Sequence, residues 1–315
     1  MNILVVGDAM IDRSIFGNIE RISPEAPVPI LLRKDSIDSL GGAANVASSL
    51  STFGANVALL SSYGNDEAGS ILKSLCTKAK LNLITCPTIG HTTTTKVRFW
   101  SSNQQVFRYD HESNFVDSNA LSSLAIEQLN SSTSYDCIVI SDYDKGVVTM
   151  DLVRSLTSYA STNNLKTICD PKGDNCDKYY GVSVITPNLK EACALTKIDA
   201  INGEDKKLYG ILLKLTRKFD ITQPIITLGK RGMCYLSPDG NLTFQEPIKT
   251  FLADPTGAGD TAIAALTYSL CLGYSFSDSV RYACAAASYT VTHVGTAPCP
   301  YNELEARYKQ LLAQA

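Results

Sequence analysis

The sequence alternates short, apolar, β-prone runs with longer amphipathic stretches of helical period. This alternation favours an α/β fold whose central sheet is mainly parallel and flanked by helices on both faces, because parallel strands need a crossover between them. Ligands then bind beyond the carboxyl ends of the strands. Strands are expected at residues 3–7, 57–62, 137–141, 167–170, 184–186 and 225–228. Helices are expected at 43–53, 65–78, 119–130, 149–163, 188–195, 206–219, 258–272, 277–293 and 301–313.

Two segments interrupt the alternation and predict a small projecting β lid. Residues 11–40 carry three prolines around two β-prone runs, and residues 92–110 alternate like a hairpin with Asn103 near its turn. A flap of two to four strands is marginal alone, so it needs a ligand beneath it or a second subunit. A homodimer through the lid is therefore expected, although a monomer whose lid is ordered by ligand would give the same pattern.

Composition narrows the function classes. The chain has 28 basic and 31 acidic side chains, a net charge of −3, and no basic tract, which disfavours nucleic acid as a partner. No apolar run has membrane-spanning length, and the first residues predict a strand and not a signal peptide. Ten cysteines lie apart without a CxxC motif, which favours free thiols in a reducing cytoplasm over disulfides or zinc.

The stretch DPTGAGDT at residues 254–261 stands where a long, largely apolar helix begins. Asp260 is either an ordinary helix cap or a carboxylate aimed at a bound anion. In the second interpretation, the N–H groups of Gly257, Ala258 and Gly259 hold a phosphoryl group at the helix N-terminus. Asp260 then accepts the proton of an attacking hydroxyl, as phosphoryl transfer requires.

A second glycine cluster, GGAANVA, begins at Gly41 and runs into the first helix. Gly41 and Gly42 either make a turn before a closely packed helix or present backbone donors to a polyol, together with the amide of Asn45. Asp8 and Asp12, which follow the first strand, would accept hydrogen bonds from its hydroxyls across the pocket.

Two further motifs follow strands. In TPNLKEA, Asn188 and Glu191 form either a helix cap or a site for a hydrated Mg²⁺ ion, which needs few protein ligands. In TLGKRG, Thr227, Gly229 and Gly232 form a glycine-flanked turn that suits the phosphates of a nucleotide.

In order and spacing, these motifs resemble the ribokinase-like (PfkB) family of sugar kinases along nearly the whole chain. Both family signatures are present, as GGAANVA and as DPTGAGDTAIAA. The resemblance implies a single sugar-kinase domain over residues 1–315, with ATP and Mg²⁺ as cofactors. It further implies a catalytic base at Asp260, an anion hole at 257–259, an NxxE motif near Mg·ATP at Asn188 and Glu191, and a nucleotide phosphate loop at Thr227, Gly229 and Gly232.

Within the family, the stretches RISPEAPVPIL, KVRFWSSNQQVFRYD and SDYDKGVV resemble the kinases that act on D-glycero-D-manno-heptose 7-phosphate. This resemblance implies phosphorylation of the anomeric hydroxyl to heptose 1,7-bisphosphate, for ADP-heptose and the lipopolysaccharide core. Many such kinases are fused to a nucleotidyltransferase with an HxGH motif, which is absent here, so the chain is either a stand-alone kinase or one part of a longer enzyme.

The alternatives are a kinase for fructose 1-phosphate, ribose or a nucleoside, and a non-catalytic nucleotide or sugar sensor on the same fold. A nicotinamide-dependent enzyme is disfavoured because no GxGxxG motif occurs.

A sugar 7-phosphate adds about two negative charges, which require cations beyond those that serve ATP. Two acidic residues at strand ends would pair with such cations or with sugar hydroxyls. The candidate cations are Arg98, Arg108, Lys145 and Lys172, and the acidic residues are Asp142 and Asp170.

Overall fold

The computed structural model describes residues 1–85, 90–102, 104–112, 116–131, 133–200 and 203–314. Its central strands are β1 (Asn2–Gly7), β4 (Asn56–Ser61), β5 (Asn82–Thr85), β8 (Cys137–Ser141), β9 (Lys166–Asp170), β10 (Val184–Ile185), β11 (Gln223–Thr227), β12 (Met233–Leu236) and β13 (Leu242–Gln245). Among the described residues they form a nine-stranded sheet in the order β13-β12-β11-β10-β9-β8-β1-β4-β5. The strands from β11 to β5 run parallel, and β12 and β13 add an antiparallel edge.

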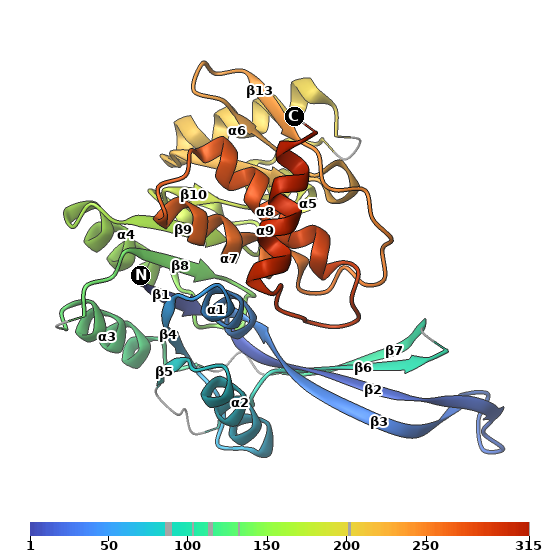
Figure 1. The fold of residues 1–315 in the computed structure, drawn as a ribbon. Coiled ribbons are helices and arrows are strands. Elements are labelled where there is room, and N and C mark those ends of the chain that lie inside the picture. Colours follow the sequence, from blue (N-terminus) through green and yellow to red (C-terminus); the bar gives the residue numbers. More distant parts are fainter. Residues whose placement is uncertain (86–89, 103, 113–115, 132, 201–202, 315) are drawn as a thin grey trace.

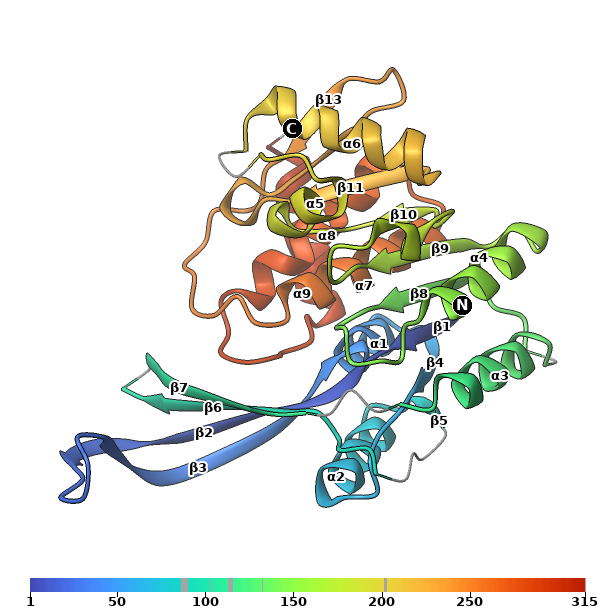
Figure 2. The same ribbon diagram turned by 180° about the vertical axis from the view of Figure 1, so that it is seen from behind.

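Helices cover both faces of this sheet (Figures 1 and 2). The core on one face contains α1 (Ala43–Thr52), α2 (Glu67–Lys78), α7 (Ala258–Cys271), α8 (Phe276–Thr290) and α9 (Tyr301–Leu312). The core on the other face contains α3 (Ser118–Leu129), α4 (Met150–Thr162), α5 (Leu189–Thr196) and α6 (Asp205–Phe219). Helix α7 is buried over most of its length, because its small alanine side chains let α1 and α8 pack closely against it.

The lid is a separate four-stranded sheet in the order β3-β2-β6-β7 that projects from the main body (Figure 1). Its strands are β2 (Ala9–Ile22), β3 (Pro29–Gly42), β6 (Thr95–Ser101) and β7 (Gln104–His111). The two segments expected to pair therefore do so, with β2 parallel to β6 and the other neighbours antiparallel. Asn103, where the hairpin turn is expected, lies outside the described residues.

The expected strands and helices of the main body are confirmed, with ends that differ by at most a few residues. Strands β5, β12 and β13 were not expected, because each spans only four residues, which is too short for a clear strand period. Among the described residues, no helix is both long and apolar enough to cross a membrane. Of the ten cysteines, the nine that the structure describes are free thiols, and Cys86 lies outside the described residues.

The sheet topology determines where a ligand can bind. The chain builds β4 and β5 on one side of β1, and then builds β8 to β11 on the other side. The strand order therefore reverses between β1 and β8, and in open α/β sheets the crevice at such a point is the usual ligand site. The loops after β1 and β8 meet there, since the Asp8 N–H donates to the Ser141 carbonyl at 3.2 Å.

Candidate active site

Asp260 lies in the first turn of α7 and points into the protein, where it is 3% exposed. Its Oδ2 accepts a hydrogen bond from Asn45 Nδ2 at 2.8 Å, and its Oδ1 accepts one from the Tyr143 hydroxyl at 2.6 Å. Burial raises the pKa of Asp260 from 3.8 to about 6, against the effect of these two donors. A carboxylate with this pKa is ionised at neutral pH and is a stronger base than a solvated one.

The glycines before Asp260 shape the start of the helix. Gly257 has φ 76°, and a Cβ there would lie 3.0 Å from Asn45 Nδ2, so both conformation and space favour glycine. The Ala258 N–H donates to the Pro255 carbonyl at 3.2 Å and is not free for an anion, contrary to the expectation for this residue. The N–H groups of Gly259 and Asp260 belong to the first turn, where the helix offers no acceptor, and they remain candidates for an anion site.

The second glycine cluster lies directly beside Asp260, with Asn45 in α1. Gly42 has φ 57°, and a Cβ there would be 2.3 Å from the Asp8 carbonyl oxygen. A Cβ added at residue 41 would lie only 2.6 Å from Asp12 Oδ2, so glycine at this position leaves room for the Asp12 carboxylate. Gly41 and Gly42 are the last residues of β3 and not a separate turn. The structure thus brings the end of β3, Asp12 and Asn45 together with the candidate base, and it gives the Asn45 amide a role that sequence reasoning missed.

Two of the acidic candidates already have protein partners. The Asp8 carboxylate accepts the backbone N–H groups of Tyr143, Lys145 and Val147 at 2.8, 3.2 and 3.0 Å, so it clamps the loop after β8. Burial, with the nearby Asp142 charge, raises the pKa of Asp8 to about 6. Both oxygens of Asp142 are bonded as well; their partners are the Asp144 N–H, the Tyr179 hydroxyl and the Lys178 ammonium.

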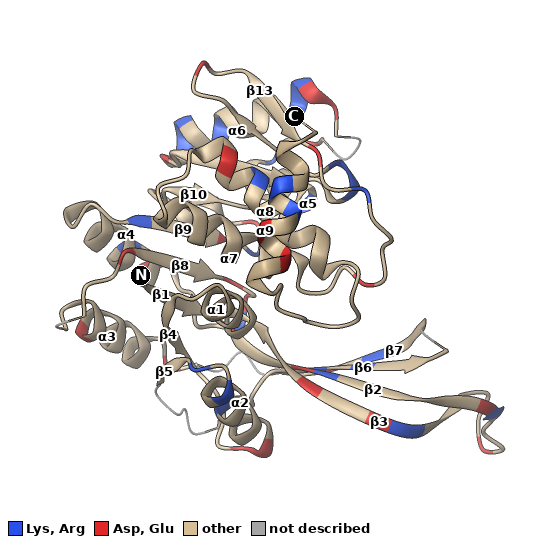
Figure 3. Cartoon of the chain, viewed as in Figure 1, with Lys and Arg blue, Asp and Glu red and all other residues tan. Residues whose placement is uncertain are grey.

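The strands of the projecting lid carry charged residues (Figure 3). The register of β2, β6 and β7 places Asp12, Lys96, Arg98, Arg108 and Asp110 on one face. Arg98 forms a buried ion pair with Asp12, and Arg108 pairs with Asp110. Lys96 Nζ lies 4.9 Å from the centre of the Tyr143 ring, and burial lowers the pKa of Lys96. The candidate Lys145 instead pairs with Glu112, 2.8 Å away, at the end of the lid.

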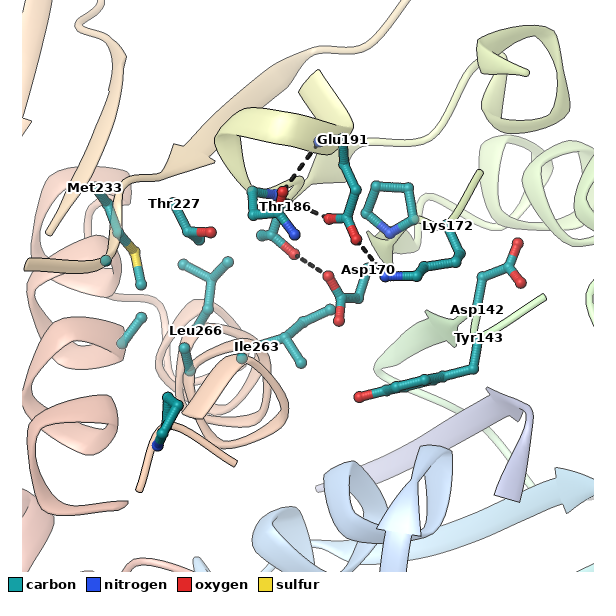
Figure 4. Close-up of a pocket in the computed structure, with 17 residues that line it drawn as sticks. Asp142, Tyr143, Asp170, Lys172, Thr186, Glu191, Thr227, Met233, Ile263 and Leu266 are labelled. Atoms are coloured by element: carbon teal, nitrogen blue, oxygen red, sulfur yellow. Dashed lines mark hydrogen bonds and ion pairs between the residues drawn. The ribbon is translucent and has the colours of Figure 1, made fainter. Parts of the chain in front are cut away.

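A cavity of about 430 Å³ lies between the ends of β8, β9 and β11 and the start of α7 (Figure 4). Asn188 and Glu191 line it and form a reciprocal helix cap, each accepting the other's backbone N–H at 3.0 Å. Lys172 Nζ lies 2.7 Å from the remaining oxygen of Glu191. Asp170 also lines the cavity, and burial together with the charges of Asp260 and Glu191 raises its pKa well above 3.8.

A second, more apolar cavity of about 600 Å³ adjoins the first, since both are lined by Thr227, Gly229 and Gly259. Thr227 pairs with Asn188 in an isolated parallel bridge, so the two motifs lie side by side. Gly232 lines the second cavity, and a Cβ there would lie 2.0 Å from the Gln245 carbonyl oxygen. Residue 232 must therefore be glycine, because a side chain there would collide with the end of β13.

Sequence reasoning missed Tyr143 and Lys96. Lys96 could have been chosen from the sequence, because it stands two residues before the candidate Arg98 and therefore lies on the same face of β6. Tyr143 follows a strand end, where ligands are expected, but the pattern gave no reason to prefer it over its neighbours.

The fold is that of a carbohydrate kinase, a phosphotransferase, and it places a buried carboxylate in the first turn of a helix. Residues 1–303 match the pfkB family of carbohydrate kinases, and the chain belongs to that family.

Curated relatives include proteins called "Bifunctional protein HldE". The protein from Sulfurimonas denitrificans is 37% identical over 305 residues, which cover 96% of this chain and 63% of that protein. The protein from Pasteurella multocida is 35% identical over 305 residues, covering 96% of this chain and 62% of the relative. The chain thus spans a little under two thirds of the length of these relatives.

Solved structures share the fold at low sequence identity. Phosphofructokinase-2 from Escherichia coli, in complex with substrates and products, is 18% identical with a TM-score of 0.81, covering 98% of this chain and 99% of that one. Ribokinase from Arabidopsis thaliana, complexed with ribose and ATP, is 17% identical with a TM-score of 0.72, covering 98% of both chains.

Proposed function

We propose that this carbohydrate kinase transfers the γ-phosphoryl group of ATP to the anomeric hydroxyl of D-glycero-D-manno-heptose 7-phosphate, giving the 1,7-bisphosphate and ADP. The observation that carries this proposal is the buried Asp260 at the start of α7, next to Gly259, which lines both cavities, and within reach of the charges of Asp12 and Lys96 on the lid. The choice of heptose rests on the sequence stretches given above and on the similarity to the HldE proteins.

The two adjoining cavities suit Mg·ATP. The apolar cavity of about 600 Å³ has the size and lining that a nucleotide base and ribose require, with Lys230 and Lys249 among its lining residues. The smaller, polar cavity would then take the phosphates, and it leads to Gly259 at the N-terminus of α7.

The residues of the smaller cavity fit a magnesium ion. Glu191 and Asp170 offer carboxylate oxygens there, and a hydrated Mg²⁺ needs only one or two such ligands. Among the described residues, no three His, Cys, Asp or Glu side chains gather as a metal-binding cluster, so a closed protein cage is not the arrangement here. When bound, the ion would neutralise charge on the phosphate oxygens.

The lid face suits an anionic sugar. On β2, β6 and β7 this face carries three cations, Lys96, Arg98 and Arg108, against the two carboxylates of Asp12 and Asp110. The excess of positive charge on this face favours a phosphorylated substrate over a neutral one. Lys172, which lines the smaller cavity, is a further candidate for the sugar phosphate, although in this structure it pairs with Glu191.

In the proposed reaction, Asp260 accepts the proton of the anomeric hydroxyl as that oxygen attacks the γ-phosphorus. The new P–O bond forms in line with the bond to ADP, which breaks, and ADP leaves with the electron pair. The first-turn N–H groups of α7 stabilise the negative charge on the transferring group.

The test is incubation of the purified chain with Mg·ATP and heptose 7-phosphate, followed by mass detection of a bisphosphorylated heptose. Fructose 1-phosphate, ribose and a nucleoside serve as competing substrates in an ADP-release assay, with Asp260→Asn as the inactive control. We expect the largest kcat/KM for the heptose phosphate. A larger value for another sugar contradicts the substrate, and binding of ATP without any transfer favours a sensor.

We further propose that the chain forms a homodimer through the lid. Phe107 and Tyr109 are 61% and 51% exposed and lie on the face of β7 opposite to Arg108, away from the charged row. Exposed aromatic residues of this kind are typical of interfaces. We expect light scattering to give the mass of a dimer, and Phe107→Asp to give a monomer; a monomeric wild-type chain at micromolar concentration contradicts the proposal.

A further inference from the structure

Tyr143 is held in place by its backbone. It follows β8, and its N–H donates to Asp8 Oδ2 at 2.8 Å, within the clamp that also fixes Lys145 and Val147. Its side chain reaches into the smaller cavity beside Asp170 (Figure 4). The phenol therefore enters the site from a rigid loop and not from a mobile one.

The Tyr143 hydroxyl complements Asn45 at the candidate base. Asn45 donates to one oxygen of Asp260 and Tyr143 donates to the other, at 2.8 and 2.6 Å. A single donor leaves a carboxylate free to turn about its Cβ–Cγ bond, whereas two donors on the two oxygens fix its plane. Burial and the neighbouring carboxylate of Asp260 raise the pKa of Tyr143 well above 10, so the phenol keeps the proton that it donates.

Charged groups from the surrounding elements act on the same carboxylate. Lys96 and Asp12 approach from the lid, with opposite effects on the pKa of Asp260. Asp170 lies at the end of β9. The negative charge of Asp170 or Asp260 makes ionisation of the other carboxyl less favourable. Against this background, the hydrogen bonds of Asn45 and Tyr143 are the direct contacts that stabilise the ionised form.

We propose that Tyr143 is a positioning residue for the catalytic base: its hydroxyl holds the Asp260 carboxylate ionised and fixed in the plane that accepts the substrate proton. This inference rests on the proposed role of Asp260. Tyr143 acts through Asp260 and does not itself contact the reacting atoms.

The test is the pH dependence of kcat/KM in Tyr143→Phe, which removes one hydroxyl and keeps the ring. Wild-type activity is expected to fall as the pH drops through about 6, where Asp260 becomes protonated. Loss of one hydrogen bond to a charged group should move this acid limb upward by about one pH unit. The rate deficit of the variant is then larger at pH 5.5 than at pH 8.5.

Tyr179→Phe is the matched control, because the Tyr179 hydroxyl donates to Asp142, another buried carboxylate, also at 2.6 Å. We expect this control to lower stability without moving the acid limb. A Tyr143→Phe profile with the wild-type acid limb, or a shift of equal size in Tyr179→Phe, overturns the inference.

A second substitution covers the case in which Tyr143→Phe does not fold. A fluorinated tyrosine placed at position 143 keeps the shape and donates a stronger hydrogen bond, so it should move the acid limb to lower pH. An acid limb that does not move to lower pH contradicts the inference.

Failure of the proposed function and failure of this inference give different results. If Asp260→Asn retains wild-type turnover, the base assignment is wrong; if that variant is inactive while both changes at position 143 leave the acid limb in place, only the inference about Tyr143 is wrong.

Discussion

Replacing Asp260 with asparagine should make the protein more stable at neutral pH while abolishing its activity. The pKa of this carboxyl rises from 3.8 to about 6 on folding, and each pKa unit corresponds to about 1.4 kcal/mol. The ionised carboxylate therefore costs the folded state about 3 kcal/mol at pH 7. The asparagine keeps nearly the same shape, since its oxygen can accept from Asn45 and its amide can donate to the Tyr143 oxygen.

The sign of the pH dependence follows from the raised pKa. Between pH 3.8 and about 6 the folded state binds the proton more tightly than the unfolded state, so wild-type stability from this group is lost as the pH rises. Asp260→Asn has no such loss. The difference in free energy of unfolding between variant and wild type should grow from about 0.5 kcal/mol at pH 4 to about 3 kcal/mol at pH 7.

Two assays check this prediction on the same preparations. Denaturant unfolding at pH 4, 5, 6 and 7 gives the stability difference, which corresponds to a gain in Tm on the order of 5 °C at pH 7. Turnover with saturating ATP and sugar phosphate should fall by about 10²-fold or more, as expected for loss of a general base. A stability difference that does not change with pH would refute the reasoning from burial, and wild-type turnover would refute the catalytic role.

Three further predictions concern the lid, the cavity and the start of α7. Arg98→Met leaves Asp12 buried and unpaired and should lower the free energy of unfolding by about 3–5 kcal/mol. Arg13→Met, on the opposite face of β2 and in a pair whose side chains are 30% and 25% exposed, should cost about 1 kcal/mol or less in the same unfolding experiment; equal losses would contradict the burial argument. Lys172→Ala should raise the KM for sugar phosphate about tenfold at unchanged KM for ATP, and an effect on ATP alone would assign Lys172 to the nucleotide. Gly257→Ala forces a side chain into a left-handed conformation and should cost about 1–2 kcal/mol in unfolding and most of the turnover; normal kinetics would show that the helix start tolerates a Cβ.

Much of the fold was predictable from the sequence because its signals are local. The apolar period of each strand and helix, and the glycines that end or begin them, are properties of short stretches. The β lid followed from the same kind of signal, since its two segments alternate and interrupt the helical pattern. Strands β12 and β13 were missed because a run of four residues is too short to show a clear strand period.

The candidate site was only partly predictable. A carboxylate at the start of a buried helix, behind two glycines, is visible in the sequence, so Asp260 could be chosen as a candidate base. Which of the other acidic residues remain available for a ligand was not visible. Asp8 and Asp142 look like ligands in the sequence, yet backbone N–H groups, Tyr179 and Lys178 occupy them.

The sequence alone thus predicted the helices of the main body, most of its strands and the place of the lid, together with the residue types at the strand and helix ends. The tertiary structure decided which side chains meet: Asn45 donates to a carboxylate 215 residues away, and Tyr143 to the same group from 117 residues away. Such partnerships arise because the N-terminal turns of α1 and α7 and the loop after β8 converge in the folded chain. A donor and an acceptor that are brought together only by this convergence leave no periodic trace in the chain, whereas the elements that carry them do.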